Sequence, residues 1–315
     1  MKVGCQTTLR GHVSISGIGV HSGLPVTLAL HPADVNTGIV FVRSDSDDER
    51  EVRADVRHVA ATEFATVLGD SVGPLVSTAE HVLAALRGLG IDNVIVELDG
   101  EEAPILDGSA EPFVTAIDQV GIASQSAPRR YIQVLKPVRV VKDDAIGELR
   151  PNPRGLRIEA EIEFDHPVIG RQTLDIDIGP TTFRNDIARA RTFGFMRDVA
   201  KLWGAGYALG ASLDNTLVVT EDRVLNPQGL RAPDEFVRHK VLDAVGDMAL
   251  AGAPLLAVYK TIRGGHRLNY AVLSALMADT SAWRVVEASE PVRRIRGHAD
   301  VAAGLVAPAY GPDKS

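Results

Sequence analysis

The sequence predicts an α+β protein with two similar domains, each a mainly antiparallel sheet packed on helices. The chain has 315 residues, enough for two ordinary domains of roughly 100 to 200 residues each. In each half, alternating apolar and polar residues typical of strands come before the apolar spacing of helices. A polar, proline-containing stretch at 124–130 separates the halves, as a linker between compact units does. We therefore expect a first domain at 1–126, a second at 127–285 and a weakly patterned tail at 286–315.

The first half contains three strand patterns and two helix patterns. Strands are expected at 26–30, where Val or Leu recurs at every second position, and at the apolar runs 38–43 and 93–98. A helix is expected from Ser77 or Thr78, because apolar residues recur at i, i+4 and i+7 before Gly90 ends it. A second helix is expected from Pro112 to Gly121, since proline suits a first turn and glycine suits a helix end.

The second half repeats this order of strands and then helices. Strands are expected at 131–141, 155–164 and 255–259, and helices at 185–205, 234–251 and 267–278. In the 155–164 strand, apolar residues alternate with Arg and Glu, so one face is solvated. The 234–251 helix has an apolar stripe that is expected to face a core, formed by Val237, Val241, Val245 and Met248.

The composition excludes several classes of protein. Hydrophobic residues make up 45% and charged residues 23%, which excludes collagen, coiled coil and general disorder. The formal net charge of −8 argues against a nucleic-acid binder, which needs a basic surface, so an anionic ligand needs a local cationic pocket. With Cys5 as the single cysteine, a metal would need His and carboxylate ligands. No signal-peptide pattern or long apolar run occurs, so we expect a soluble, cytoplasmic protein.

Polar groups share one side of the expected 234–251 helix. His239, Asp243 and Asp247 follow one another at four-residue spacing, which stacks an imidazole and two carboxylates along that side. A histidine and a carboxylate on consecutive turns can bind one metal ion. The alternative is a solvated polar face with a His–Asp hydrogen bond, and the spacing alone does not exclude it.

Glu80 and His81 lie at the start of the helix expected after Ser77. Ser77 and Glu80 match a capping box, in which the Glu side chain returns to the cap amide. The alternative is catalytic, because a carboxylate beside a metal-binding histidine is well placed to take a proton from a reacting water. In that case His81 would be a further metal ligand.

The remaining histidines and glycines give weaker indications. His266 follows two glycines after the 255–259 strand, and is either a catalytic group on a loop or a surface residue. Gly17 and Gly19 match the start of a dinucleotide-binding pattern, which we reject because Ser22 replaces the third glycine and no helix follows. The other histidines are interpreted as structural or exposed, namely His12, His31, His58, His166 and His298.

Seven segments, taken in order, carry a resemblance to a known family. They lie at 17–23, 77–81, 90–93, 105–109 (Ile-Leu-Asp-Gly-Ser), 190–198 (Ala-Arg-Thr-Phe-Gly-Phe-Met-Arg-Asp), 234–247 and 265–266. Together they resemble the zinc-dependent UDP-3-O-acyl-N-acetylglucosamine deacetylases of lipid A biosynthesis, a pathway that leads to lipopolysaccharide. The resemblance implies an active site between two α+β domains, shaped by one inserted element from each. It also implies one Zn²⁺ per chain bound by His81, His239 and Asp243, and three protein ligands suit a catalytic zinc with an open position.

The resemblance implies a role in hydrolysis for each residue around the metal. Glu80 is the general base on the zinc-bound water, and Thr192 donates a hydrogen bond to the oxyanion. His266 is the general acid for the leaving amine, with Asp247 holding it charged and oriented. The expected products are acetate and the UDP-3-O-acyl-glucosamine.

The resemblance implies a monomeric protein that binds no nucleic acid. Its implied partner is a small UDP-sugar that carries an acyl chain. Lys240 is expected to bind the diphosphate, Phe193 to pack on the nucleotide or sugar, and Asp198 to make a further contact. The acyl chain needs an apolar groove, for which the suggested lining is Val20, Met196, Val199, Ala208 and Ala211.

Two other functions stay open from the sequence. A zinc amidohydrolase of the same architecture could act on another acylated amino sugar. A non-catalytic protein that binds a sugar nucleotide or a lipid could use His81, His239 and Asp243 only as hydrogen-bonding groups. Metal content distinguishes the second alternative from an enzyme.

Overall fold

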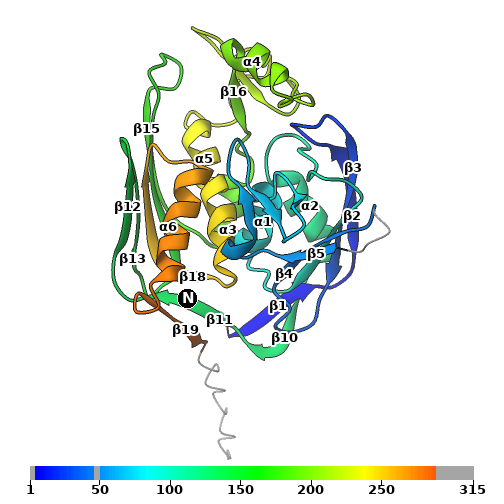
Figure 1. Ribbon diagram of the computed structural model, residues 1–315, viewed down its shortest axis with the longest axis vertical. Helices are drawn as coiled ribbons and strands as arrows, with labels where there is room; N and C mark the ends of the chain where they lie inside the picture. Colours follow the sequence, from blue (N-terminus) through cyan, green and yellow to red (C-terminus); the bar gives the residue numbers. More distant parts are fainter. Residues whose placement is uncertain (1–3, 46–49, 289–315) are drawn as a thin grey trace, which may run out of the picture.

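In the computed structural model, which describes residues 4–45 and 50–288, two sheets enclose a layer of helices (Figure 1). The sheet of the first half has the strand order β2-β3-β9-β4-β5. Its strands are β2 (Val13–Ile18), β3 (Pro25–Pro32), β4 (Ile39–Arg43), β5 (Arg50–Arg53) and β9 (Val94–Leu98). Neighbouring strands are antiparallel except β4 and β9, which run parallel.

The sheet of the second half has seven strands. Their order is β12-β13-β18-β11-β19, and β14 pairs with both β18 and β15. The strands are β11 (Arg130–Val134), β12 (Val138–Lys142), β13 (Ala145–Pro151), β14 (Leu156–Glu163), β15 (Arg171–Asp177), β18 (Leu255–Ile262) and β19 (Trp283–Glu287). β18 runs parallel to β11 and β14, and the other pairs are antiparallel. The alternation expected in β14 is present, because Ile158, Ala160 and Ile162 are buried.

Four helices fill the space between the sheets (Figure 1). α1 (Glu80–Leu89) packs against α5 (Glu235–Met248), and α2 (Glu111–Val120) packs on α1 and β2. α6 (His266–Ala278) contacts α5 and covers β12 and β13, while α5 also contacts β14 and β15. This layering brings the start of α1, the side of α5 and the start of α6 to the boundary between the two halves.

Short elements complete the fold. A two-stranded sheet pairs β1 (Cys5–Leu9) with β10 (Ile122–Pro128), and a three-stranded sheet joins β6 (Val59–Ala61), β7 (Val67–Gly69) and β8 (Pro74–Val76). β16 (Phe193–Phe195) pairs with β17 (Leu217–Val219), and with η3 (Met196–Asp198) and α4 (Val199–Gly204) it forms the projection at the top of Figure 1. The remaining turns are η1 (Val56–His58), α3 (Pro180–Thr182), the π-helical η2 (Phe183–Ile187) and η4 (Ala249–Ala251). No helix of the described residues is both long and apolar enough to cross a membrane.

The predicted α+β class is confirmed, as are most of its elements. α1, α2, α5 and α6 lie where helices were expected, and β3, β4, β9, β14 and β18 lie where strands were expected. The apolar stripe of α5 is buried along its whole length, at Val237, Val241, Val245 and Met248.

Three local expectations were wrong. The expected linker at 124–130 lies largely in β10, whose pairing with β1 satisfies its backbone. The helix expected at 185–205 is interrupted, because Phe193–Phe195 forms β16 and only Val199–Gly204 is a regular helix. The strand expected at 131–141 is two strands, since Pro137 lies between them and proline has no amide for a ladder. The tail expected at 286–315 stays a prediction: it begins within β19, and its residues 289–315, with His298 among them, lie outside the described residues.

Candidate active site

Three residues from two distant parts of the sequence meet where α1 packs on α5. One ligand atom from each of His81, His239 and Asp243 lies within 4.8 Å of the others, and all three residues are buried. Asp243 Oδ1 is 3.3 Å from His239 Nε2 and 3.7 Å from His81 Nε2. In the part of the chain that the structure describes, this is the one cluster of three or more His, Cys, Asp or Glu side chains arranged to hold a metal ion.

The close approach of the two helices depends on Gly246. A Cβ atom on Gly246 would lie 2.1 Å from the carbonyl oxygen of Glu80. The first turn of α1 therefore rests directly on the α5 backbone, one turn beyond Asp243. Glycine is required at this position because any side chain would meet backbone atoms, which cannot move aside as a flexible side chain does.

Gly246→Ala is expected to push α1 away from α5 and to move His81 relative to Asp243. We expect a loss of about 1–3 kcal/mol in the free energy of unfolding, as for overpacking in a core, together with weaker metal binding. Thermal unfolding and metal content after dialysis measure both effects. Gly204→Ala is the control, because an added Cβ there would have no described atom within 4 Å apart from its own helix backbone and chain neighbours. A Gly246→Ala protein that matches the wild type in both measurements would contradict this account of the packing.

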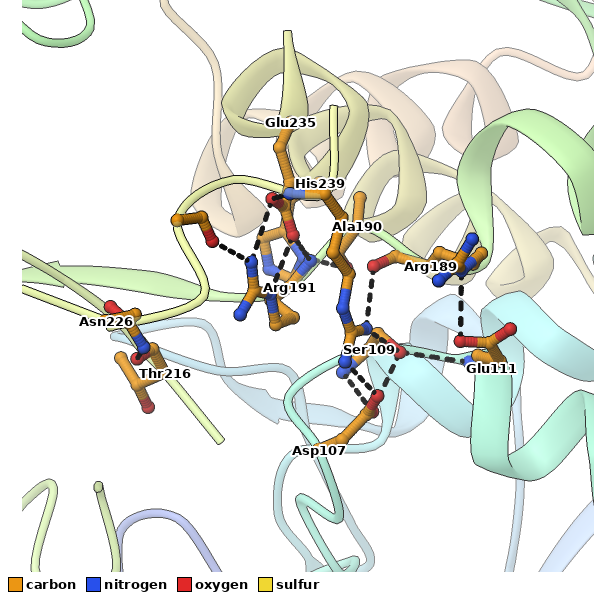
Figure 2. Close-up of polar contacts among 12 residues, drawn as sticks. Asp107, Ser109, Glu111, Arg189, Ala190, Arg191, Thr216, Asn226, Glu235 and His239 are labelled. Carbon is orange, nitrogen blue, oxygen red and sulfur yellow. Dashed lines mark hydrogen bonds and ion pairs between the residues drawn. The ribbon is translucent and has the colours of Figure 1, made fainter. Parts of the chain in front are cut away.

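His239 is held in one tautomer by the backbone. Its Nδ1 lies 3.0 Å from the carbonyl oxygen of Ala190, which can only accept, so Nδ1 carries the proton (Figure 2). Burial lowers the pKa of His239 to about 3, so the imidazole is neutral. Its Nε2 therefore directs a lone pair toward Asp243 Oδ1.

Asp243 supplies the charge of the cluster. Its Oδ2 accepts a hydrogen bond of 2.8 Å from Lys240 Nζ, whereas its Oδ1 is buried without any hydrogen-bond partner among the described residues. Burial opposes ionisation, but neighbouring basic groups, Lys240 among them, outweigh it and hold the pKa of Asp243 well below its usual range. A lone pair of His239 and an unpartnered carboxylate oxygen thus face each other at 3.3 Å.

Two acceptors at that distance repel each other unless a cation lies between them. Ligand atoms about 2.0–2.1 Å from a tetrahedral ion lie about 3.3–3.4 Å apart, which matches the distance between His239 Nε2 and Asp243 Oδ1. Imidazole and carboxylate are ligands that zinc accepts. The residues present therefore fit a bound metal ion, and the alternative of a solvated polar face on α5 is excluded by their burial.

A buried ion pair holds the backbone that orients His239 (Figure 2). Arg191 Nε and Nη2 donate to the two oxygens of Glu235 at 2.9 and 3.1 Å, and both side chains are almost fully buried. The amide of Arg191 also donates to Glu235, so Ala190 and the 192–195 segment are fixed to the start of α5. Arg231 extends the same attachment to Asp107, in the 105–109 segment.

Glu80 and His266 lie beside the cluster and face each other. Glu80 Oε1 is 3.8 Å from His266 Nε2, and Glu80 Oε2 accepts a hydrogen bond of 2.9 Å from the Thr66 amide. The capping-box alternative is therefore wrong, and the N-terminal end of α1 has no side-chain cap. Burial raises the pKa of Glu80. Burial opposes the charge on His266, but Asp247 and Glu80 outweigh it and raise the pKa of His266 to about 10.

Asp247 contacts His266, as the family resemblance implied, and two further residues that the sequence did not indicate, Thr66 and Asn269. Its Oδ2 accepts from His266 Nδ1 at 2.9 Å and from Asn269 Nδ2 at 2.7 Å, and its Oδ1 accepts from Thr66 Oγ1 at 2.6 Å. Tyr259 in turn donates to Asn269 Oδ1 at 2.6 Å. Local sequence gave no signal for Thr66 or Asn269, because Thr66 lies just before β7 and Asn269 lies in α6, both far from Asp247 in the sequence.

The metal-ligand cluster, Glu80 and His266 line a cavity of about 380 Å³, within the range of about 300–1,000 Å³ typical of ligand sites. Its lining is Thr62, Phe64, Glu80, His81, Thr192, Phe193, His239, Lys240, Asp243, Gly265, His266 and Arg267. The Lys240 ammonium lies 5.4 Å from the centre of the Phe193 ring, so a cation and an aromatic face are presented together. Arg267 adds a second cation that the sequence analysis did not single out.

The other suggested substrate contacts lie outside this lining. Met196 and Asp198 are exposed beside α4, and Val199 is half-buried. Val20 and Ala208 are brought near each other, because the amides of Leu209 and Gly210 donate to the carbonyls of His21 and Val20. The proposed groove formed by Val20, Met196, Val199, Ala208 and Ala211 stays a prediction.

A larger cleft of about 830 Å³ lies between α6 and the first sheet. Its lining includes two carboxylates, Asp55 and Asp92, which are paired with Arg57 and Arg129. Because its lining contains no imidazole and no free carboxylate, we assign the chemistry to the smaller cavity.

The α+β fold with two buried imidazoles, a carboxylate and an adjacent Glu–His pair defines the class of metal-dependent hydrolases. The family described as "LpxC: UDP-3-O-acyl N-acetylglycosamine deacetylase" matches residues 6–278. Proteins named UDP-3-O-acyl-N-acetylglucosamine deacetylase from Brucella ovis, Brucella canis and Brucella melitensis are each 50% identical over 284 residues, which is 90% of this chain and 99% of theirs. The chain belongs to this deacetylase family, which is a family of metalloenzymes.

Proposed function

We propose that the chain hydrolyses the 2-acetamido group of UDP-3-O-(3-hydroxyacyl)-N-acetylglucosamine to acetate and the free 2-amine. This reaction is an early committed step of lipid A biosynthesis. The observation that carries the proposal is the unpartnered Oδ1 of Asp243 between two imidazoles, in one cavity with Glu80 and His266. The names of relatives that are 50% identical support the choice of substrate.

We infer that His81, His239 and Asp243 hold one Zn²⁺ ion. When bound, zinc supplies Lewis-acid polarisation of the amide carbonyl and of an attacking water. The neutral His239 and the ionised Asp243 are in the protonation states that ligands need. Lys240 keeps Asp243 Oδ2 occupied, which leaves Oδ1 directed at the two imidazoles.

Glu80 and His266 divide the proton transfers between them. Glu80 Oε1 accepts a proton from the water as its oxygen bonds to the amide carbon, and Thr192 donates a hydrogen bond to the resulting oxyanion. As the carbon–nitrogen bond breaks, His266 Nε2 gives its proton to the leaving amine. Asp247, 2.9 Å from His266 Nδ1, keeps the imidazole charged and oriented.

Binding of the substrate is assigned to the cations and the apolar groups around the cavity. Lys240 attracts the diphosphate and Phe193 packs on the nucleotide or sugar, with Asp198 as a further contact. The acyl chain follows the groove of Val20, Met196, Val199, Ala208 and Ala211. We also propose a cytoplasmic monomer with domains at 1–126 and 127–285, whose boundary lies near the passage from β10 to β11.

Metal removal tests the proposal directly. We expect about one zinc per chain, loss of acetate release from the UDP-sugar after chelation, and recovery on adding back one equivalent of Zn²⁺. Metal content by atomic emission and acetate release from the same samples are the two measurements. A metal-free protein with full activity would refute the mechanism. A zinc protein that deacetylates another acylated amino sugar instead would keep the metal chemistry and overturn the substrate.

A further inference from the structure

One residue touches both carboxylates that serve the proton transfers. Thr66 lies just before β7 and is 1% exposed. Its amide donates to Glu80 Oε2 at 2.9 Å, and its hydroxyl donates to Asp247 Oδ1 at 2.6 Å. The first contact stays within the first half of the chain, whereas the second joins positions 181 residues apart, across the boundary between the halves.

The hydroxyl of Thr66 has a distinct task in the hydrogen bonding of Asp247. Oδ2 of Asp247 already serves His266 Nδ1 and Asn269 Nδ2. For Oδ1, the Thr66 hydroxyl is the sole donor within residues 4–45 and 50–288. Asp247 is 2% exposed, so water does not readily replace this bond. Without the hydroxyl, Oδ1 is a buried acceptor with no partner among the described residues, and the orientation of the carboxylate depends on the contacts of Oδ2 alone.

We propose that Thr66 is a positioning residue that sets His266 relative to Glu80. The Thr66 amide fixes the base on α1, and its hydroxyl fixes Asp247 on α5, which orients the imidazole at the start of α6. The same hydroxyl oxygen is 3.4 Å from His266 Nδ1, so it also limits movement of the ring toward β7. This inference rests on the proposed function, in which Glu80 and His266 exchange protons with the reacting groups.

Thr66→Val tests the hydroxyl alone, because valine has the same shape and keeps the amide that donates to Glu80. We expect kcat to fall by about 10- to 100-fold with KM changed by less than about 3-fold, as for a small misplacement of a catalytic group. Thr66→Ser restores the hydroxyl and should bring kcat back to within about 3-fold of the wild type. Zinc content should be the same in all three proteins.

Thr8→Val is the matched control for the loss of a buried threonine hydroxyl. Thr8 is 8% exposed and its Oγ1 accepts from the Ala33 amide, away from the cavity. We expect Thr8→Val to lower the unfolding temperature without changing kcat. A wild-type kcat in Thr66→Val would overturn the proposal. An equal loss in Thr66→Ser and Thr66→Val would also overturn it, because packing rather than the hydroxyl would then be responsible.

Imidazole NMR separates this inference from the proposed function. The proton on His266 Nδ1 should give a downfield resonance in the wild type, assigned by its absence from His266→Ala. In Thr66→Val this resonance should broaden or shift upfield, whether or not the wild type releases acetate. An unchanged resonance would overturn the positioning role, whereas an inactive wild type with the expected spectral change would overturn only the assigned reaction.

Discussion

Glu80→Gln is expected to retain its zinc and to lose about 10²- to 10⁴-fold in kcat, the range for removal of a general base. Glutamine keeps the size of the side chain, and its amide oxygen can still accept from the Thr66 amide, which is 2.9 Å from Oε2 in the wild type. An amide cannot take the proton of the attacking water. KM should change little, because Glu80 acts on the water rather than on the sugar.

Initial rates of acetate release, measured with metal content on the same samples, check this expectation. Asp92→Asn makes the same carboxylate-to-amide change at a buried position whose partners are Arg129 and Thr7. That control should lower stability and leave kcat intact. Unchanged turnover in Glu80→Gln would remove Glu80 from the role of base, and lost zinc would show that it acts through the metal cluster.

Helices and strands with a regular apolar pattern were predictable, because the pattern shows which face of the element is buried. The stripe of α5 and the alternation of β14 repeat over several turns or residues, so neighbouring positions support the same interpretation. Phe193–Phe195 has no such repeating pattern, and it was wrongly expected to be helical. A short aromatic segment forms a strand here because β17 pairs with it, and that partner lies more than twenty residues further along the chain.

The metal cluster could be predicted only in part from the residues themselves. The spacing of His239 and Asp243 on one helix indicates a pair of ligands, but it also fits a hydrogen-bonded polar face. For His81, the local sequence left a metal ligand as the alternative to a neighbour of a capping box, and the resemblance to a family favoured the ligand. The fold distinguishes these interpretations, because Gly246 allows α1 to pack directly on α5. No local sequence pattern predicts that contact.

Thr66 and Asn269 illustrate why residues that hydrogen-bond to a buried carboxylate are hard to predict from the sequence. Each makes one hydrogen bond to Asp247 from a different element, and neither residue type is unusual in its own segment. Their importance follows from burial, because the charge of Asp247 is stable in the interior only when donors surround it. Asp247 is buried only once the helices and sheets have packed together, so its local sequence does not show which donors it needs.

His266→Ala is expected to lower kcat by about 10²- to 10⁴-fold and to remove the alkaline limb of the rate profile. The proposed mechanism requires His266 protonated and Glu80 ionised in the wild type. The rate should therefore decline as pH rises through the pKa of His266, which its carboxylate neighbours raise to about 10 despite burial. It should also decline as pH falls through the pKa of Glu80, which burial raises. A bound cation disfavours both protonated forms, so zinc loading shifts both limbs to lower pH.

The profile of kcat from acidic to alkaline pH, with added imidazole in a second series, measures these effects. Imidazole can enter the space left in His266→Ala and supply a proton to the leaving amine, so part of the lost rate should return. His31→Ala is the control, because His31 pairs with Glu97 on the first sheet and lies outside the cavity lining. If His266→Ala kept its alkaline limb, another group would have to protonate the amine. Lys240, the nearest cation to Asp243 in the same cavity, would then be the next residue to replace.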